Sequence, residues 1–363
     1  MSVFASRLIR WQARHGRRGL PWQRTRDPYR IWVSEVMLQQ TQVATVITYY
    51  ERFLESFPDL KALALAPLER VLAVWSGLGY YSRARNLHAA ARILAGSNGG
   101  RFPRTRGKLV SLPGLGRSTA AAIAVFAFGR REAILDGNVK RVLARHFAVP
   151  GFPGEKRVEE RLWTLAESLL PARNVARYTQ AIMDLGAGVC TRTQPACARC
   201  PVRTSCAALS RREVEAYPQP RPRRAVPEKK TAMLILLRSG EVLLEKRQPL
   251  GLWGGLWCLP EMPPGADPRP YCRRRFGASV SAGERLPELR HGFTHFRLTV
   301  TPLICRVDSA SQWAGEPGQI WLPLEEIAQA AVPAPVRKLI ALLPESNRDS
   351  PRFRQTSVRA ANR

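Results

Sequence analysis

The chain has 363 residues, enough for two domains, and 45% of them are hydrophobic, enough to build real cores. Its 57 Lys and Arg against 28 Asp and Glu give a net charge of +29, so we expect a polyanionic partner, above all nucleic acid. It has neither a window of about 18 uncharged apolar residues nor a signal-peptide core. An anionic membrane is the runner-up partner, but the lack of such a window argues against a membrane span. We therefore expect a cytoplasmic, nucleoid-associated protein without a membrane partner.

Helical patterns fill the first part of the chain. Apolar residues recur at helical spacing in the segments 2–14, 31–39, 43–57, 67–75, 87–94, 157–170 and 175–187. Thr41 is the expected N-cap of the helix at 43–57, and Ser82 can cap the helix that holds residues 87–94. No convincing strand occurs before residue 209, so we expect an all-α domain over residues 1–209.

A tight turn and the helix after it are central to this domain. The turn reads Leu-Pro-Gly-Leu-Gly, and Gly114 and Gly116 let the backbone bend sharply and approach a partner closely. It leads into an Ala-rich buried helix at 117–128, whose free N-terminal amides and dipole favour a phosphate. Residues 136–141 are expected to form a polar loop that presents one carboxylate, Asp136. The turn alone would equally fit an ordinary helix–turn–helix corner with a capping Asp.

Glu35 lies within an apolar helix, in the sequence Ile-Trp-Val-Ser-Glu-Val-Met-Leu. An isolated Glu is usually solvated, but these neighbours predict at least partial burial, which raises the pKa of a carboxyl. A carboxylic acid that stays neutral at pH 7 can serve as a general acid.

Four of the seven cysteines stand in the pattern C-x6-C-x2-C-x5-C, at Cys190, Cys197, Cys200 and Cys206. Disulfides are disfavoured in the cytosol, so the cluster indicates a metal site over residues 190–206. Four thiolates can hold zinc or an iron–sulfur cluster, and the spacing does not decide between them; four unligated thiols are the alternative. The arginines of this loop, which can meet phosphates, are Arg192, Arg199 and Arg203.

The chain changes character after residue 209. Residues 210–227 are rich in proline and arginine and are expected to form a stiff, extended linker. The elements expected after it are strands at 231–238, 241–247 and 296–308 and a helix at 335–343, with a hairpin turn at Ser239-Gly240. They predict an α+β domain over 228–345, followed by a disordered basic tail at 346–363.

The Leu-Pro-Gly-Leu-Gly turn, with Asp136 twenty residues after Gly116, resembles the helix–hairpin–helix DNA glycosylases. Two stretches resemble the MutY branch of that family: Trp-Val-Ser-Glu-Val-Met-Leu-Gln-Gln-Thr-Gln-Val around Glu35, and Gly-Leu-Gly-Tyr-Tyr further on. The resemblance implies a helix–hairpin–helix over residues 104–128 whose amides bind DNA phosphates. It also implies that Glu35 is the catalytic acid, that Asp136 is a catalytic carboxylate, and that Asn138 helps to hold this arrangement.

The resemblance assigns further residues to the DNA. Gln40, beside Thr41, becomes a wedge that fills the gap left by a flipped base, and Trp22 lines the adenine pocket. Tyr80 stacks beside the damaged guanine, where an intercalating side chain unstacks bases and bends DNA. Without the resemblance, Gln40 would be an ordinary polar residue and Tyr80 a core side chain. The cysteine spacing matches the branch that carries a 4Fe–4S cluster, which implies that cofactor in a structural role.

Ser118 distinguishes this chain from the bifunctional relatives. They carry a Lys at this point of the hairpin helix, which attacks the sugar and leads to strand cleavage, whereas Ser118 has no amine. Lys140 lies nearby in the sequence; a phosphate contact is its expected role, although it could trap the product. The resemblance therefore implies a monofunctional enzyme.

The second domain resembles a Nudix fold through Leu-Trp-Gly-Gly-Leu-Trp-Cys-Leu-Pro-Glu at 252–261. Where a Nudix hydrolase has its metal-binding acids, residues 267–277 hold one acid and many bases and cannot assemble a magnesium site. We therefore expect this domain to bind rather than hydrolyse. Phe293, Thr294 and His295 resemble the Phe-Ser-His loop with which the MutY family reads 8-oxoguanine; Thr keeps the hydroxyl and adds a methyl group.

The resemblance covers residues 3–345 and implies an all-α helix–hairpin–helix glycosylase domain with a four-cysteine iron–sulfur loop, followed by an α+β Nudix-like domain. The implied activity is removal of adenine mispaired with 8-oxoguanine or guanine in double-stranded DNA, by a monomer whose protein partners stay open. Two alternatives remain: an endonuclease III-like lyase for oxidised pyrimidines, and a non-catalytic iron–sulfur protein that binds DNA lesions. Ser118 and the second domain argue against the first, and Glu35 with Asp136 argues against the second.

Overall fold

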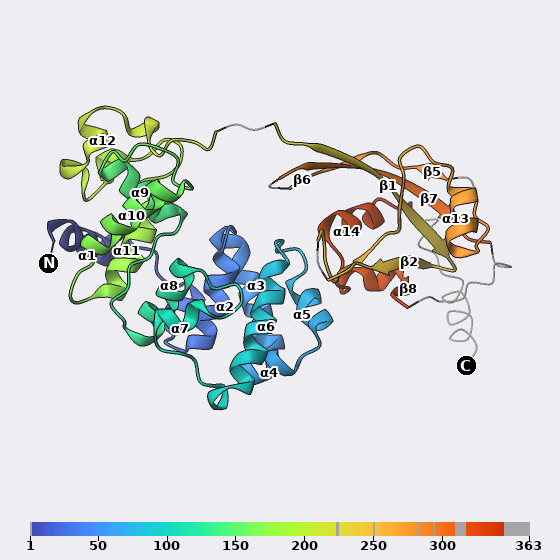
Figure 1. Cartoon of the computed structure of the whole chain (residues 1–363), viewed down its shortest axis with the longest axis horizontal. Helices are drawn as coiled ribbons and strands as arrows, with labels where there is room; N and C mark the ends of the chain where they lie inside the picture. Colours follow the sequence, from blue (N-terminus) through green and yellow to red (C-terminus); the bar gives the residue numbers. More distant parts are fainter. Residues whose placement is uncertain are drawn as a thin grey trace, which may run out of the picture. The chain divides into compact units, whose positions relative to one another are not determined.

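The computed structural model describes residues 2–222, 225–249, 251–281, 283–293, 295–308 and 317–344. The chain forms two compact units (Figure 1). The helical unit comprises Met1–Ala66 and Arg85–Arg223, and the C-terminal unit comprises Arg224–Arg363 together with the earlier segment Pro67–Ala84. Nothing in the sequence predicted that this segment would join the C-terminal unit. The expected tail at 346–363 lies outside the described residues.

The described part of the helical unit consists of helices and short 3-10 turns, which confirms the all-α prediction. In chain order these are α1 (Val3–His15), η1 (Pro21–Arg24), α2 (Pro28–Leu38), α3 (Val43–Ser56), α4 (Leu60–Leu65), α6 (Ser82–Gly96), η2 (Asn98–Gly100), α7 (Arg106–Val110), α8 (Arg117–Phe128), α9 (Gly137–His146), α10 (Lys156–Ser168), α11 (Val175–Gly188), η3 (Cys197–Arg199), η4 (Arg203–Ser205), α12 (Ala207–Ser210) and η5 (Val214–Ala216). α6 begins in the segment that belongs to the C-terminal unit and continues in this one.

One hydrophobic core joins α1, α8, α9, α10 and α11. These helices form because apolar side chains recur every three to four residues and leave one face of each helix to be buried. Leu8, Leu143 and Leu162 are fully buried there, and each side chain of this kind contributes about 1.5–3 kcal/mol by leaving water. A further contact joins α2 to α8, where the Gln39 Nε2 donates to the Thr119 hydroxyl at 3.1 Å.

The start of α3 differs from the prediction, because its N-cap is Gln42 and not Thr41. Gln40 turns the chain with a left-handed φ of 56°, so the extended residue directly before the helix is Gln42. The Thr41 hydroxyl instead donates to the Gln39 carbonyl at 3.4 Å. Ser82 is already the first residue of α6, so it is not an N-cap either.

The prediction of a loop at 136–141 is wrong, because these residues cap and begin α9. Asp136 is the N-cap, and its Oδ1 accepts a hydrogen bond from the Val139 N–H at 2.7 Å. Polar residues dominate the segment and suggested a loop, yet α9 buries an apolar face that includes Val142 and Leu143. An Asp at this position satisfies an amide that the helix start leaves unpaired and interacts favourably with the helix dipole.

The described part of the C-terminal unit contains an eight-stranded sheet with helices, which confirms the α+β prediction (Figure 1). Its elements are α5 (Leu68–Trp75), β1 (Glu228–Arg238), β2 (Glu241–Lys246), β3 (Trp257–Cys258), β4 (Glu261–Met262), α13 (Pro268–Phe276), β5 (Glu284–Arg285), β6 (Leu289–Gly292), β7 (Arg297–Arg306), β8 (Gln319–Pro323), η6 (Leu324–Ala328) and α14 (Ala334–Ala341). The strands β3, β2, β1, β7 and β5 follow one another across the sheet; β4 also pairs with β1, β6 with β7 and β8 with β2.

The two longest strands, β1 and β7, run parallel, with Thr231 opposite Val300. β1 and β2 form the predicted antiparallel hairpin, and its turn residues Ser239 and Gly240 both have positive φ. The apolar side chains of β1 and β2 are buried in a core that also holds Cys272 of α13. β6 runs antiparallel to β7, so the short connection between them, which contains Phe293, projects from the end of this pair.

The first part of the expected linker is bound to the helical unit. The Arg145 Nε donates to the Val214 and Tyr217 carbonyls, and the Gly151 N–H donates to the Gln219 Oε1 at 3.0 Å. None of the described helices is both long enough and apolar enough to cross a membrane.

Candidate active site

A cavity of about 1560 Å³ lies in the helical unit. Its lining comes from α2 and the turn after it, from the starts of α8 and α9, and from α11. It brings together eight residues that the sequence singled out: Trp22, Glu35, Gln40, Thr41, Ser118, Asp136, Asn138 and Arg192. The cavity exceeds the roughly 300–1,000 Å³ of a typical small-molecule site, so it suits part of a polymer better than a small metabolite.

Glu35 lines this cavity from α2. The helix begins at Pro28, behind Asp27, whose Oδ1 accepts from the Tyr29 N–H at 2.9 Å. Burial and, to a smaller extent, the charge of Asp136 raise the pKa of Glu35 to about 8. Glu35 therefore carries a proton at neutral pH and can donate it, as its apolar neighbours in the sequence indicated.

Asp136 lines the same cavity in a different environment. Burial raises the pKa of Asp136 above its usual value, and hydrogen bonds from the Val139 N–H and the Asn138 side chain to the charged form offset part of that rise. The Asn138 Nδ2 donates to the Asp136 Oδ2 at 3.4 Å, in addition to the Val139 bond. Fixed donors thus favour a negative charge on Asp136, so the proton of this carboxyl pair belongs on Glu35.

Arg141 holds Asn138 in place and was missed by the sequence reasoning. Its Nη2 donates to the Asn138 Oδ1 at 2.8 Å and to the Gly186 carbonyl at 2.7 Å, and its Nε donates to the Cys190 carbonyl at 2.8 Å. A Cβ on Gly186 would lie 2.6 Å from the Asn138 Cβ, so α11 approaches α9 in a way that requires glycine here. Arg141 therefore connects the carboxylate site with the first residue of the cysteine loop.

The hairpin glycines have distinct roles. Gly114 has a left-handed φ of 78°, and a Cβ there would lie 2.7 Å from the Asn86 Cβ, so both conformation and space require glycine. Gly116 is the N-cap of α8, and a Cβ there would meet nothing within 4 Å. As a residue without a side chain, it leaves the first amides of α8 available to an anion.

Ser118 and Lys140 are both bound to other protein groups. The Ser118 hydroxyl accepts from the Leu135 N–H at 3.0 Å, which fixes the residue just before Asp136. The Lys140 Nζ pairs with the Glu159 carboxylate at 2.9 Å and does not line the cavity. The geometry therefore gives Ser118 a positioning contact and places the Lys140 amine away from Asp136's cavity.

Gln40 and Trp22 both line the cavity. Gln40 is exposed and held in a left-handed conformation, which a non-glycine residue rarely adopts and which is frequent at functional sites. Trp22 is buried and packs edge-on against Tyr50, with ring centroids 5.4 Å apart. Six further arginines besides Arg141 line the cavity, and the sequence reasoning singled out only the last of them: Arg17, Arg18, Arg24, Arg26, Arg177 and Arg192.

The four cysteines of the 190–206 loop are unpaired and partly buried. Among the described residues, no three His, Cys, Asp or Glu side chains converge on a position for a single metal ion. Burial and, to a smaller extent, the neighbouring Cys190, Cys206 and Cys197 raise the pKa of Cys200 to about 11. The four thiols therefore lie near one another in the fold.

The remaining predicted residues belong to the C-terminal unit. Tyr80 is 49% exposed and has a left-handed φ of 48°. Phe293 stacks on Phe296, with ring centroids 4.6 Å apart, and His295 is exposed. Thr294 lies outside the described residues. The connection that carries Phe293, Thr294 and His295, together with its two flanking strand ends, is called the recognition hairpin (residues 289–297) below.

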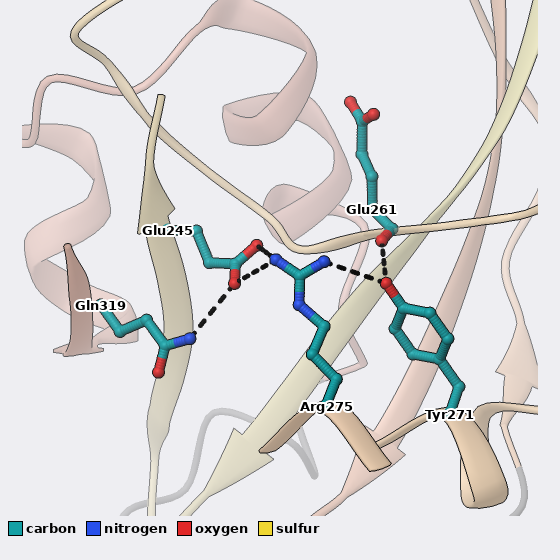
Figure 2. Close-up of polar contacts among 5 residues, drawn as sticks. All are labelled: Glu245, Glu261, Tyr271, Arg275 and Gln319. Carbon is teal, nitrogen blue, oxygen red and sulfur yellow. Dashed lines mark hydrogen bonds and ion pairs between the residues drawn. The ribbon is translucent and has the colours of Figure 1, made fainter. Parts of the chain in front are cut away.

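Figure 2 shows Arg275 of α13 against the carboxylate of Glu245 of β2. A Nudix hydrolase would carry acids on the helix that holds Arg275. Arg275 Nη2 lies 2.7 and 2.9 Å from the two Glu245 oxygens, and its Nη1 donates to the Tyr271 hydroxyl at 3.1 Å. Gln319 Nε2 donates to the same carboxylate at 3.2 Å, and the Tyr271 hydroxyl donates to the Glu261 carbonyl at 2.7 Å. A guanidinium thus neutralises Glu245, which leaves this carboxylate ill suited to a cation.

Comparisons with known proteins agree with this arrangement. Residues 33–168 match the family described as HhH-GPD superfamily base excision DNA repair protein, and residues 231–342 match the NUDIX domain. The chain is 36% identical over 346 residues to the adenine DNA glycosylase of Buchnera aphidicola subsp. Baizongia pistaciae, covering 95% of this chain and 98% of that one. It is 35% identical over 406 residues to the adenine DNA glycosylase of Mus musculus, covering 94% of this chain and 78% of that one.

A solved structure supports the same assignment for the helical part. A thermostable thymine-DNA glycosylase aligns with a TM-score of 0.53 and 31% identity, covering 58% of this chain and 96% of that one. The chain therefore belongs to the adenine DNA glycosylase family and is a DNA glycosylase of base excision repair, with a Nudix-like domain after its helical one.

Proposed function

We propose that this enzyme hydrolyses the bond between adenine and deoxyribose in DNA where the adenine is mispaired with 8-oxoguanine or guanine. The observation that carries the proposal is the pair Glu35 and Asp136, which line a single cavity. Glu35 is protonated, and Asp136 accepts hydrogen bonds that stabilise its charged form. A base inside a duplex cannot reach such a cavity, so the adenine must be flipped out of the stack.

Each carboxyl has its own part in the reaction. Glu35 gives its proton to N7 of adenine, so that the base accepts the bonding electrons as the glycosidic bond breaks. Asp136 stabilises the oxocarbenium-like sugar by its charge or by a transient bond, and Asn138 holds Asp136 in place. Water then adds to the sugar carbon and releases a proton, leaving free adenine and an abasic site.

The hairpin and the cavity both supply groups for holding the DNA. The hairpin amides behind Gly114 and Gly116 bind phosphate, and the arginines that line the cavity neutralise the backbone around it. Gln40 fills the gap left by the flipped adenine, and Trp22 lines the pocket that receives it. Thr41, next to the wedge, contacts the DNA beside it.

The enzyme leaves the DNA strand intact. Ser118 has no amine, and its hydroxyl is engaged by the Leu135 N–H. Lys140, the lysine nearest to Asp136 in the sequence, is paired with Glu159 outside the cavity, and its DNA role is a phosphate contact. The residues that line this cavity therefore include no lysine amine that could form a Schiff base with the sugar.

The cysteine loop is proposed to hold a 4Fe–4S cluster through Cys190, Cys197, Cys200 and Cys206. When bound, the cluster would act as a structural crosslink of the loop and not as a reactant. Arg141 and Arg145 hold the loop from the protein side, because they donate to the carbonyls of Cys190 and Thr191. The loop then supports Arg192 at the edge of the cavity.

Selectivity for the opposite base is assigned to Tyr80 and to Phe293, Thr294 and His295 of the recognition hairpin. The Nudix-like domain that carries the hairpin binds and does not hydrolyse, because residues 267–277 hold one acid and many bases, and Arg275 of this segment also neutralises Glu245 (Figure 2). We place the enzyme in the cytoplasm, acting on double-stranded DNA as a monomer.

A glycosylase assay tests the proposal. Duplexes that pair adenine with 8-oxoguanine, guanine or thymine are incubated with enzyme, and abasic sites are revealed by hot alkali. We expect excision opposite 8-oxoguanine and guanine and little opposite thymine. Release of an oxidised pyrimidine in place of adenine, or excision that ignores the opposite base, would overturn it.

A further inference from the structure

The segment Pro67–Ala84 packs into the C-terminal unit through α5. The buried face of α5 consists of Val71, Leu72 and Trp75. Gly255 comes so close that a Cβ there would lie 3.4 Å from the Leu72 Cδ1. Glu69 adds an ion pair with Lys246 at 3.1 Å, but these side chains are 47% and 41% exposed, so the pair contributes little. The buried polar contacts lie at the other end of the helix.

Ser76 directly follows α5 and is buried. Its hydroxyl donates to the Val332 carbonyl at 2.7 Å and accepts from the Arg337 Nη2 at 2.9 Å. Tyr81 is also buried, and its hydroxyl approaches the same Val332 carbonyl at 3.5 Å. It also accepts from the Gly77 N–H at 3.3 Å. The two ends of the Gly77–Tyr81 loop are therefore held at one point, just before α14.

Tyr80 lies within the loop that these contacts hold. Its left-handed φ of 48° is unusual for an aromatic residue and persists only where the surroundings impose it. The Arg83 guanidinium lies 5.4 Å from the centre of the Tyr80 ring and 5.4 Å from that of Trp75. The position of this half-exposed ring therefore depends on how the loop ends are anchored.

α14 also contacts β6, the first strand of the recognition hairpin. Lys338 is close enough to His291 of β6 for its charge to lower the pKa of that imidazole, in addition to the larger effect of burial. The His291 ring packs edge-on against Phe293, with centroids 4.6 Å apart. Adjacent residues of α14, Arg337 and Lys338, thus lie against Ser76 and near the recognition hairpin.

We propose that Arg337 is a positioning residue that couples the recognition hairpin to Tyr80. α14 contacts the hairpin, and Arg337 on the same helix fixes Ser76 and so the start of the Tyr80 loop. These contacts thereby fix the position of the Tyr80 ring, which stacks beside the base, relative to the hairpin, which reads that base. This inference rests on the proposed function, because it requires the hairpin to contact the base opposite adenine.

The test compares Ser76→Ala and Arg337→Met with the wild type. Arg269→Met is the matched control, because Arg269 lies in the same unit and makes an exposed ion pair with Asp267. Adenine excision is measured under single-turnover conditions opposite 8-oxoguanine and opposite guanine. We expect Ser76→Ala and Arg337→Met to lower the preference for 8-oxoguanine about tenfold, since each removes a charge-assisted hydrogen bond from a buried position. An equal loss opposite both bases would overturn the coupling and leave these residues a purely structural role.

A double-mutant cycle with His295→Ala tests the coupling itself. Arg337→Met is expected to change the preference less than about twofold further once His295 is gone, whereas independent residues would give additive effects. The position of Tyr80 is followed by the fluorescence of 2-aminopurine placed beside 8-oxoguanine. Arg337→Met is expected to reproduce the change caused by Tyr80→Ala.

The same measurements separate the coupling from the proposed function. If the wild type prefers 8-oxoguanine and Arg337→Met leaves both that preference and the fluorescence intact, the coupling alone is wrong. If the wild type has no such preference, the proposed function fails and the coupling with it.

Discussion

Glu35 on α2 and Asp136 at the start of α9 line one cavity, and burial together with the Asp136 charge raises the pKa of Glu35 to about 8. Asp136, by contrast, accepts hydrogen bonds from the Val139 N–H and the Asn138 side chain. The pair therefore combines a proton donor with a charged carboxylate, which is what cleavage of a glycosidic bond requires.

Glu35→Gln and Asp136→Asn are each expected to lower adenine excision about 10²–10⁴-fold, because each removes a group that acts in the transition state. Binding of the duplex should stay largely intact. Single-turnover excision and duplex affinity are measured for both variants, with Glu160→Gln on α10 as a control outside the cavity. Near-normal excision by Asp136→Asn would remove Asp136 from the mechanism.

Gly114→Ala is expected to destabilise the fold by about 1–3 kcal/mol, because it forces a side chain into a left-handed conformation. The new Cβ would also lie 2.7 Å from the Asn86 Cβ. Gly116→Ala is the matched comparison, since its φ is −78° and its Cβ would meet nothing within 4 Å. Denaturant unfolding gives the free energy for both, and equal values would show that the hairpin does not need glycine at 114.

Strand breaks are expected only after alkali, because Ser118 has no amine and Lys140 is paired with Glu159. The product is analysed on denaturing gels with and without hot alkali, for the wild type and for Lys140→Ala. Strong nicking without alkali that disappears in Lys140→Ala would show that this lysine reaches the sugar after all.

Replacement of both Thr294 and His295 by Ala is expected to weaken the preference for 8-oxoguanine over guanine. The two bases differ at the C8 oxygen and the N7 hydrogen, and a hydrogen-bonded contact to such an edge is worth ~1–3 kcal/mol. Excision opposite guanine should fall much less, because Glu35 and Asp136 lie in the helical unit. An equal loss with both opposite bases would make the hairpin a general DNA-binding surface.

Local features of the site could be predicted from the sequence. The apolar neighbours of Glu35 predicted its raised pKa, because burial of a helix residue follows from the pattern on either side of it. The Leu-Pro-Gly-Leu-Gly sequence predicted a tight turn, and Gly114 adopts a left-handed φ there that few residues other than glycine adopt. Two β-prone runs and the turn residues between them likewise predicted the β1–β2 hairpin.

The missed features depend on contacts between distant segments. Asp136 was predicted to stand in a loop because its neighbours are polar, with a capping Asp as the alternative, and the structure shows that it caps α9. The bonds from Arg141 to Asn138 and Cys190 join three segments that no periodicity relates. The same holds for Ser76 and Arg337, whose contact places an early helix in the C-terminal unit.

The raised pKa of Glu35 also affects stability. The folded protein holds this proton more tightly than an unfolded chain, in which the pKa is near the ordinary 4.5. The contribution of Glu35 to stability is therefore complete below that pH and is lost as the pH rises through about 8. Thermal unfolding between these limits should show the wild type losing more stability than Glu35→Gln, which has no proton to release.

The pH dependence of adenine excision tests most directly whether Glu35 is the proton donor. The rate is measured with enzyme below the duplex Kd, because this regime reports the ionisation of the free enzyme. The expected rate is constant near neutral pH and falls about tenfold per unit above the pKa of about 8, where Glu35 loses its proton. A rate that stays constant to well above that pH would contradict the role of Glu35 as the general acid.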